Sequence, residues 1–134
     1  MVEVKVTVEV DVNPTEDEEK VQLAVKNLFD GVSFSVKPGF KSNLLSAEAK
    51  GQSSLVKMRN LIRNDRIRDA ARRILHKSVS ENMICFFLNK QVAFAGHVCF
   101  SEETSESPLG PIKVTVKSDD PHKLIDWLAE KTVK

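Results

Sequence analysis

The feature that most constrains the fold is a strict alternation at the start of the chain. Valine occupies every even position from Val2 to Val12, and charged or hydroxyl side chains occupy the odd positions between them. A period of two is that of a β-strand, whose successive side chains point to opposite faces of a sheet. The segment therefore predicts a strand with one buried and one solvent-exposed face.

Further elements are predicted along the rest of the chain. A helix begins with Thr15 as its cap and ends before Gly31, and a final helix begins with Asp120 as its cap and Pro121 in its first turn. Strands are expected at 32–36, at 43–51 (where a helix is also possible), over a hairpin from 82 to 100 that turns at Asn89 and Lys90, and at 112–117. No repeat or linker interrupts the pattern. The order predicts a single α+β domain over 1–134, with helices layered on a largely antiparallel sheet.

The predicted hairpin is apolar on both of its faces. An antiparallel strand pair that leaves one face in water should carry polar residues on that face. The two sets of side chains are Ile84, Phe86, Leu88, Ala93, Ala95 and Cys99 on one face, and Met83, Cys85, Phe87, Val92, Phe94 and Val98 on the other. Either helices cover both faces or a second subunit covers one of them, and we predict a homodimer.

Composition and motifs exclude several classes of protein. No segment has the length and apolarity of a membrane span or of a secretory signal, so we expect a cytoplasmic protein without a membrane partner. Cys85 and Cys99 are expected to be buried free thiols, too far apart for a disulfide in the predicted hairpin. The three histidines lack metal-ligand spacing, and no nucleophile–base pair or Gly-rich phosphate loop is present. We therefore expect neither an enzyme nor a bound cofactor or metal.

All six arginines lie between Arg59 and Arg73. Residues 54–78 have helical periodicity, but the apolar face of their first half differs from that of the second half by roughly half a turn at 100° per residue. One straight helix cannot bury both faces against one core. The chain is therefore predicted to break near Asn64 and Asp65, which are good helix caps, and to form two helices joined by a tight corner.

The charge of this region is concealed by the overall composition. The chain has 20 basic and 19 acidic residues, yet residues 50–77 hold nine basic and two acidic ones. One interpretation is a solvated helical face, neutralised by the acidic helix start at 16–19 or by the acidic segment 102–106. The other is a surface that binds the phosphates of RNA, because a guanidinium pairs bidentately with phosphate. The predicted RNA contacts are Lys57, Arg59, Arg63, Arg66, Arg68, Arg72, Arg73 and Lys77.

Two further residues could support such a surface. Lys90 at the tip of the predicted hairpin could reach a phosphate beside the arginines, although Asn89 and Lys90 could equally serve only as a turn. Phe40 is the one aromatic candidate for base stacking, in a chain without tyrosine. Recognition by shape and phosphate contact is therefore expected rather than base-by-base reading.

Four stretches go beyond a generic pattern: "FFLNKQVAFAGHVCF" at 86–100, "SPLGPIKVTV" at 107–116, "NPTEDEEKV" and "IRDAARRIL". Together they resemble, over nearly the whole chain, an archaeal family of uncharacterised cytoplasmic proteins, and "LNKQ" and "SPLGPI" are the most specific parts of the resemblance. The resemblance implies an α+β fold similar to that of the ribosomal protein that binds 5S rRNA, dimers, and a role in RNA binding. We predict a non-enzymatic RNA-binding protein with a structured, ribosomal-type RNA as partner. The alternative is a protein–protein interaction module whose basic helices dock an acidic partner.

Overall fold

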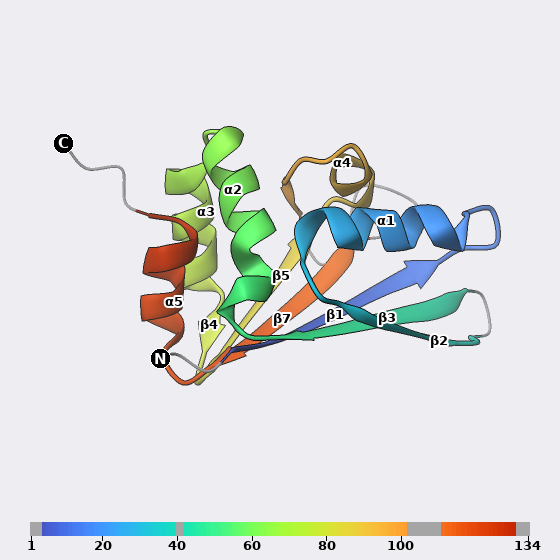
Figure 1. The fold of residues 1–134 in the computed structure, drawn as a ribbon, viewed down its shortest axis with the longest axis horizontal. Coiled ribbons are helices and arrows are strands. Elements are labelled where there is room, and N and C mark those ends of the chain that lie inside the picture. Colours follow the sequence, from blue (N-terminus) through green and yellow to red (C-terminus); the bar gives the residue numbers. More distant parts are fainter. Residues whose placement is uncertain (1–3, 40–41, 102–110, 131–134) are drawn as a thin grey trace.

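The computed structural model describes residues 4–39, 42–101 and 111–130. Its strands form one antiparallel sheet in the order β2-β3-β1-β7-β5-β4, with β6 also paired to β5 (Figure 1). The strands are β1 (Val4–Val12), β2 (Ser33–Lys37), β3 (Asn43–Lys50), β4 (Val79–Ser80), β5 (Met83–Leu88), β6 (Phe100–Ser101) and β7 (Ile112–Ser118). The helices are α1 (Glu18–Leu28), the 3₁₀ turn η1 (Gln52–Leu55), α2 (Val56–Asn64), α3 (Arg68–Lys77), α4 (Lys90–Phe94) and α5 (Pro121–Leu128).

Strand β1 lies in the middle of the sheet, and its alternating valines form the floor of the core. Val6 is paired with Ala49 of β3 on one side and with Val116 of β7 on the other, and each of these side chains is at most 4% exposed. A fully buried valine contributes roughly 1.5–3 kcal/mol relative to an exposed one. The strand predicted from the period-two pattern is confirmed, as is the position of the charged residues on the opposite face.

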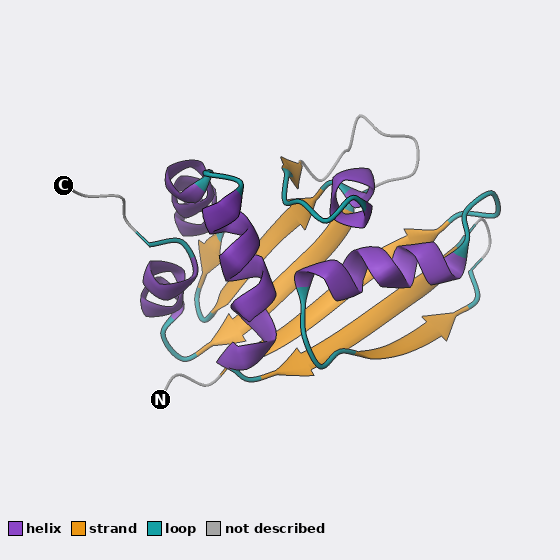
Figure 2. Ribbon diagram, turned by 45° about the horizontal axis from the view of Figure 1, so that its top comes forward, coloured by secondary structure: helices purple, strands orange, loops and turns teal. Residues whose placement is uncertain are grey.

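All the described helices cover one face of the sheet and leave the other face bare (Figure 2). Their apolar stripes pack onto β1, β5 and β7, with Val25, Ile62, Leu75 and Ile125 fully buried between the two layers. The predicted α+β fold, a largely antiparallel sheet with helices layered on it, is confirmed. None of these helices combines the length and apolarity needed to cross a bilayer.

The predicted hairpin from 82 to 100 is wrong in its second half. Strand β5 has the predicted position, but the chain then forms helix α4 and returns as the short strand β6, which pairs Leu88 with Phe100. Asn89 is a helix cap here, because its side chain accepts a hydrogen bond from the backbone N–H of Val92 at 3.0 Å. Asparagine favours both turns and helix caps, so the local sequence did not distinguish them.

This correction alters two further predictions. Ala93 is buried in α4 and does not lie on a strand, so a second apolar face along a hairpin does not exist as predicted. The predicted homodimer therefore no longer has the support of a hairpin that is apolar on both faces. Cys85 and Cys99 are free thiols, as expected, but neither is buried, because Cys85 is partly exposed and Cys99 is exposed.

Smaller differences concern helix starts. The first helix is capped by Asp17 rather than Thr15, through a hydrogen bond from the backbone N–H of Glu19 at 2.9 Å. The final helix begins as predicted, with Asp120 accepting from the N–H of Lys123 and with Pro121 at the first turn.

Candidate nucleic-acid interface

The arginine region folds as the predicted pair of helices, and the corner between them is a defined C-terminal motif of α2. The backbone N–H of Ile67 donates to the carbonyl of Ile62, and that of Arg66 donates to the carbonyl of Arg63, both at 3.2 Å. These are the two hydrogen bonds of a Schellman motif, which satisfies the last carbonyls of a helix. Arg66 occupies the position of this motif that glycine normally takes, with a φ of 58°.

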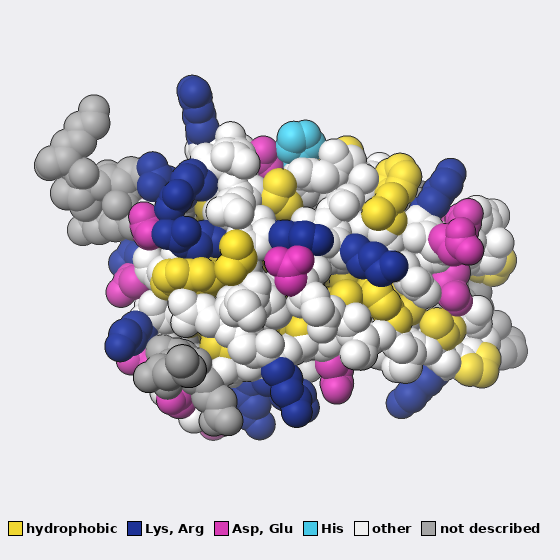
Figure 3. Space-filling view, in the orientation of Figure 1, with side chains coloured by type: hydrophobic (Ala, Val, Ile, Leu, Met, Phe, Trp, Pro, Cys, Tyr) yellow, Lys and Arg dark blue, Asp and Glu magenta, His cyan; other side chains and the backbone are white. Residues whose placement is uncertain are grey.

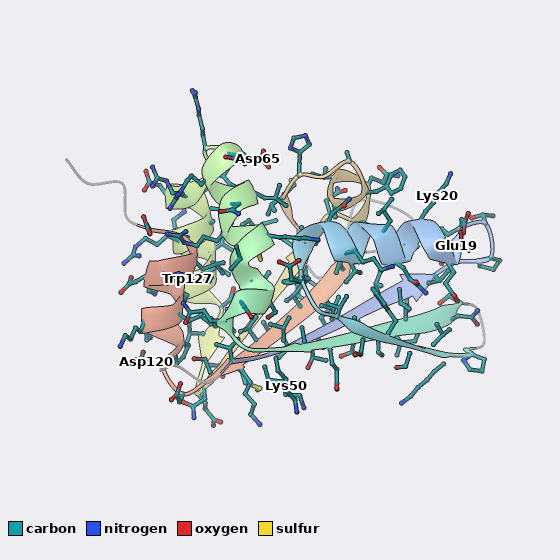
Figure 4. All side chains as sticks on the ribbon, in the orientation of Figure 1. Glu19, Lys20, Lys50, Asp65, Asp120 and Trp127 are labelled. Atoms are coloured by element: carbon teal, nitrogen blue, oxygen red, sulfur yellow. The ribbon has the colours of Figure 1, made fainter. Side chains whose placement is uncertain are left out.

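The break lies where it was predicted, but the predicted capping residues are wrong. Neither Asn64 nor Asp65 caps α3, whose N-cap is Ile67 without a side-chain hydrogen bond. The Asp65 carboxylate instead accepts from the backbone N–H of Val98 at 3.1 Å and lies 3.0 Å from Nδ1 of His97. Asp65 therefore ties the corner at the end of α2 to the segment after α4 (Figure 4).

The left-handed conformation of Arg66 leads to a stability prediction. Replacing Arg66 by glycine should raise the free energy of unfolding by roughly 1 kcal/mol, because only glycine adopts a positive φ without strain. Arg73→Gly is the matched control, since it also removes an exposed arginine but lies inside α3, where glycine costs about 1 kcal/mol. Urea denaturation of both variants measures the difference. Destabilisation by Arg66→Gly comparable to that by Arg73→Gly would show that the corner is not strained.

The corner forms one side of a shallow surface depression, which we call the arginine hollow. Four arginines contribute to it, from the end of α2, the corner and the first turns of α3. Its lining residues are Arg63, Arg66, Ile67, Arg68, Asp69, Ala70 and Arg73. A group of basic side chains lies over α2, α3 and α5 in the space-filling view (Figure 3). Four of the residues predicted to contact RNA, Arg63, Arg66, Arg68 and Arg73, therefore lie around one depression.

Three arginines of the hollow have no carboxylate partner in the described part of the chain. The ion pairs found there, within 4.0 Å, involve neither Arg66 nor Arg68 nor Arg73. Arg66 and Arg73 are exposed, and Arg68 is half-buried. Their guanidinium groups are thus available to an external anion.

Arg59 and Arg72 have a different position, because both contact the C-terminal end of α5. Arg59 donates from Nε to the carbonyl of Trp127 at 2.9 Å, stacks on the ring of Trp127, and forms an ion pair with Glu130. Arg72 pairs with Asp126 at 2.6 Å and reaches the carbonyl of Ala129. Cations at a helix C-terminus satisfy its free carbonyls and its dipole. These two arginines, only 23% and 25% exposed, hold α5 against α2 and α3.

Arg63 shares features with the arginines of the hollow and with Arg59. Its side chain is 45% exposed and is 3.6 Å from the second carboxylate oxygen of Glu130, a longer contact than that of Arg59. The hydrogen bond and charge of Arg59, with further contributions from Arg63 and Arg68, hold the pKa of the Glu130 carboxyl below its ordinary value. Arg63 therefore belongs to the hollow while sharing an anion with Arg59.

The predicted lysines are dispersed. Lys57 pairs with Asp30 at 3.3 Å and donates to the carbonyl of Lys26, which ties α2 to the end of α1. Lys77 is exposed at the end of α3, one helix length from the corner. Neither residue lines the arginine hollow.

Lys90 is not at the tip of a hairpin beside the arginines, so that prediction is wrong. Its residue is 5% exposed, and its ammonium lies between the carbonyl of Asp11 at 2.7 Å and the carboxylate of Glu16 at 3.0 Å. Burial by itself raises the pKa of Glu16, but hydrogen bonds from Asn13 and Lys90 and the charge of Lys90 hold it below its ordinary value. Lys90 is therefore part of the fold and not of a binding surface.

Of the two predicted neutralising segments, only the helix start at 16–19 is described, and it forms no ion pair with a described arginine. Glu16 pairs with Lys90 instead, and the acidic segment 102–106 lies outside the described residues, as does Phe40. The carboxylates that do meet arginines are Asp126 and Glu130, which sequence reasoning missed. Asp126 lies in α5 and Glu130 follows its end, and only the packing of α5 on α2 and α3 shows that both meet arginines. No group of three or more metal-ligating side chains occurs among the described residues.

Comparisons with known proteins find a matching family model, relatives and solved structures. A family model described as RNA binding matches residues 5–118. A UPF0201 protein of Sulfurisphaera tokodaii is 46% identical, over 97% of this chain and 90% of its own length, and one of Pyrobaculum islandicum is 45% identical, over 93% and 88%. The crystal structure of a UPF0201 protein from Methanococcus jannaschii has a TM-score of 0.82 at 32% identity, covering 93% of this chain and 98% of that one.

Proposed function

Because this chain belongs to the UPF0201 family of archaeal proteins, whose family model is described as RNA binding, we propose that it binds structured RNA through the arginine hollow. The observation that carries the proposal is the set of Arg66, Arg68 and Arg73, which converge on one hollow without a carboxylate partner in the described chain. The resemblance to an archaeal family that the sequence indicated is confirmed. The likeness to the ribosomal protein that binds 5S rRNA stays a prediction, as do a ribosomal RNA partner and the cytoplasmic location.

The geometry favours contact with phosphates. The corner between α2 and α3 fixes the backbone of Arg66 by two hydrogen bonds, and the two helices that carry the other arginines are packed on the sheet. A guanidinium offers a planar fork that matches two phosphate oxygens. Three such forks in a hollow can contact neighbouring phosphates of one RNA strand or of two strands across a groove.

Base reading has little support in this surface. Trp127 is half-buried and its ring carries Arg59, so it is not a free stacking platform. Among the described residues, no aromatic side chain lines the arginine hollow. Double-stranded RNA is recognised mainly through its shape and its phosphates, and we therefore propose recognition of this kind.

The proposed set of RNA contacts is smaller than the set predicted from the sequence. It consists of Arg63, Arg66, Arg68 and Arg73, with Lys77 at the periphery. The other predicted residues form ion pairs within the protein: Lys57, Arg59, Arg72 and Lys90. The homodimer stays a prediction. It rests on Met83, Cys85 and Phe87, which give β5 an apolar strip on the bare face of the sheet.

Salt dependence of RNA binding tests the proposal. A fluorescently labelled RNA stem-loop, titrated with the protein at several salt concentrations, should bind with a log–log slope of about −3 to −4, because each arginine–phosphate contact contributes about −0.7 to −0.9. The readout is fluorescence anisotropy. Absence of binding at low salt would contradict the proposal and would favour an acidic protein partner for the same arginines.

A further inference from the structure

The bare face of the sheet carries a second concentration of positive charge, far from the arginines along the sequence. Lys5 of β1 is paired directly with Lys50 of β3 on one side and with Lys117 of β7 on the other. All three side chains are exposed and lie on the face opposite the helices, where Lys50 is labelled in Figure 4. We call these three residues the lysine row.

The lysine row is unusual for its position in a sheet. Like charges directly opposite each other on neighbouring strands are destabilising. Two rows further along the same face, Glu9 lies opposite Lys113, so the sheet places opposite charges together there. No described carboxylate forms an ion pair with Lys5, Lys50 or Lys117. The three ammonium groups therefore lie side by side without an ion pair to a described acidic residue.

The lysine row also lines a depression at this end of the sheet. The other lining residues add polar groups from the ends of neighbouring elements. Among the described residues, the lining is Val4, Lys5, Lys50, Asn82, Lys117, Ser118 and Asp119. The turn that carries Asn82 is held to β7 by a hydrogen bond from the N–H of Ser118 to the carbonyl of Asn82, at 2.8 Å. The depression thus has rigid walls made by sheet backbone.

We propose that the lysine row is a phosphate-binding site, distinct from the arginine hollow. Neighbouring strands are about 4.8 Å apart, so the three lysine stems start within roughly 10 Å of one another and can converge on one multiply charged group. A phosphate offers several oxygens and more than one negative charge, which three ammonium donors can share. Binding of such an anion relieves the repulsion within the row.

The arginine hollow and the lysine row lie on different sides of the protein. The arginines belong to the helical layer, which covers one face of the sheet (Figure 1), whereas the lysines occupy the opposite face. The phosphate could belong to a second segment of a bound RNA or to a free phosphate compound. The chemistry of recognition is the same for both sources, and the experiment below separates them.

Inorganic pyrophosphate is a direct probe of the lysine row. In a titration followed by ¹H–¹⁵N correlation spectra at constant ionic strength, the amide signals of Lys5, Lys50 and Lys117 should shift and saturate. Lys5→Gln and, as a second variant, Lys117→Gln should each weaken binding about tenfold, because each removes one charge-assisted contact. Lys113→Gln is the matched control, an exposed lysine on the same face of β7 that lies outside the row, and it should bind as the wild type does.

Two results would overturn the site. One is a set of shifts that does not saturate in the millimolar range, and the other is an equal loss of affinity in Lys113→Gln. The source of the phosphate follows from the RNA titration repeated with Lys5, Lys50 and Lys117 all changed to Gln. If the log–log salt slope of RNA binding becomes less negative by about 2, the site binds RNA phosphates. If that slope is unchanged while pyrophosphate binding is lost, the site binds a free phosphate compound. Failure of the wild type to bind RNA would end the proposed function but would leave the pyrophosphate result standing.

Discussion

Reversing the three unpaired charges of the arginine hollow, with Arg66→Glu, Arg68→Glu and Arg73→Glu in one variant, is expected to weaken RNA binding by at least about 100-fold near 100 mM salt. Three lost phosphate contacts also make the log–log salt slope less negative by about 2 to 3. The fold should survive. None of the three side chains forms an ion pair with a described residue, and a glutamate at the first position of α3 suits the positive end of the helix dipole.

A control variant with the same change of net charge separates local contact from general electrostatics. Lys20→Glu, Lys37→Glu and Lys123→Glu alter exposed lysines on α1, β2 and α5, outside both the arginine hollow and the lysine row. Charges more than a Debye length of about 8–10 Å from the RNA are largely screened, so this variant should lose only a few-fold in affinity. An equal loss in the two variants would mean that the arginines attract RNA only through the net charge of the protein.

The second large effect concerns stability and follows from the position of Lys90. Lys90→Met should lower the free energy of unfolding by about 3–5 kcal/mol, because it leaves the buried carboxylate of Glu16 without its cation. Combining it with Glu16→Gln should recover part of the loss, since a neutral amide is less costly to bury alone than a carboxylate. Urea denaturation gives both values. The RNA affinity of Lys90→Met, measured below its unfolding transition, should equal that of the wild type.

The Glu16–Lys90 pair also predicts a dependence of stability on pH. The pKa of Glu16 is lower in the folded protein than its ordinary value of 4.5. The unfolded chain therefore binds a proton more readily than the folded one, and the pair stabilises the fold fully above that ordinary value. This stabilisation is lost as the pH falls through the folded pKa, and it is absent in Glu16→Gln. A wild type and a Glu16→Gln variant that lose stability in parallel between pH 6 and about 3 would contradict this assignment.

Several features of the fold could be read from the sequence because they depend on short-range periodicity. The alternating valines of β1 fix which side of that strand is buried whatever its neighbours are. The half-turn mismatch between the apolar faces of α2 and α3 requires a break, and the break occurs at that place. In both cases the burial of apolar side chains acts within one element, so the local pattern is sufficient.

Other features could not be read because two local solutions compete. Asn89 can start a tight turn or cap a helix, and the apolar residues after it fit either a strand or one side of α4. The outcome depends on whether Ala93 is buried against another element, and its backbone carbonyl indeed accepts a hydrogen bond from Asn27 of α1. The sequence contains both partners of this contact but no sign that they meet.

The candidate site shows the same division. The concentration of all six arginines in one stretch is a property of the sequence, and it indicates an anion-binding surface without any structure. Which arginines remain available is a tertiary property. Arg59 and Arg72 form ion pairs with the carboxylates at the end of α5, whereas Arg66, Arg68 and Arg73 form no ion pair with a described residue.

The sequence by itself therefore determined the buried side of β1, the two-helix arginine region, the α+β class and the excess of positive charge within residues 50–77. The tertiary structure alone decided the burial of Lys90, the role of α5 as partner of Arg59 and Arg72, and the alignment of Lys5, Lys50 and Lys117. The physical reason is the distance along the sequence over which each interaction acts. Hydrophobic periodicity is set by neighbours within a few residues, whereas a charge acquires its partner only through strand register and helix packing, which join residues more than 40 positions apart.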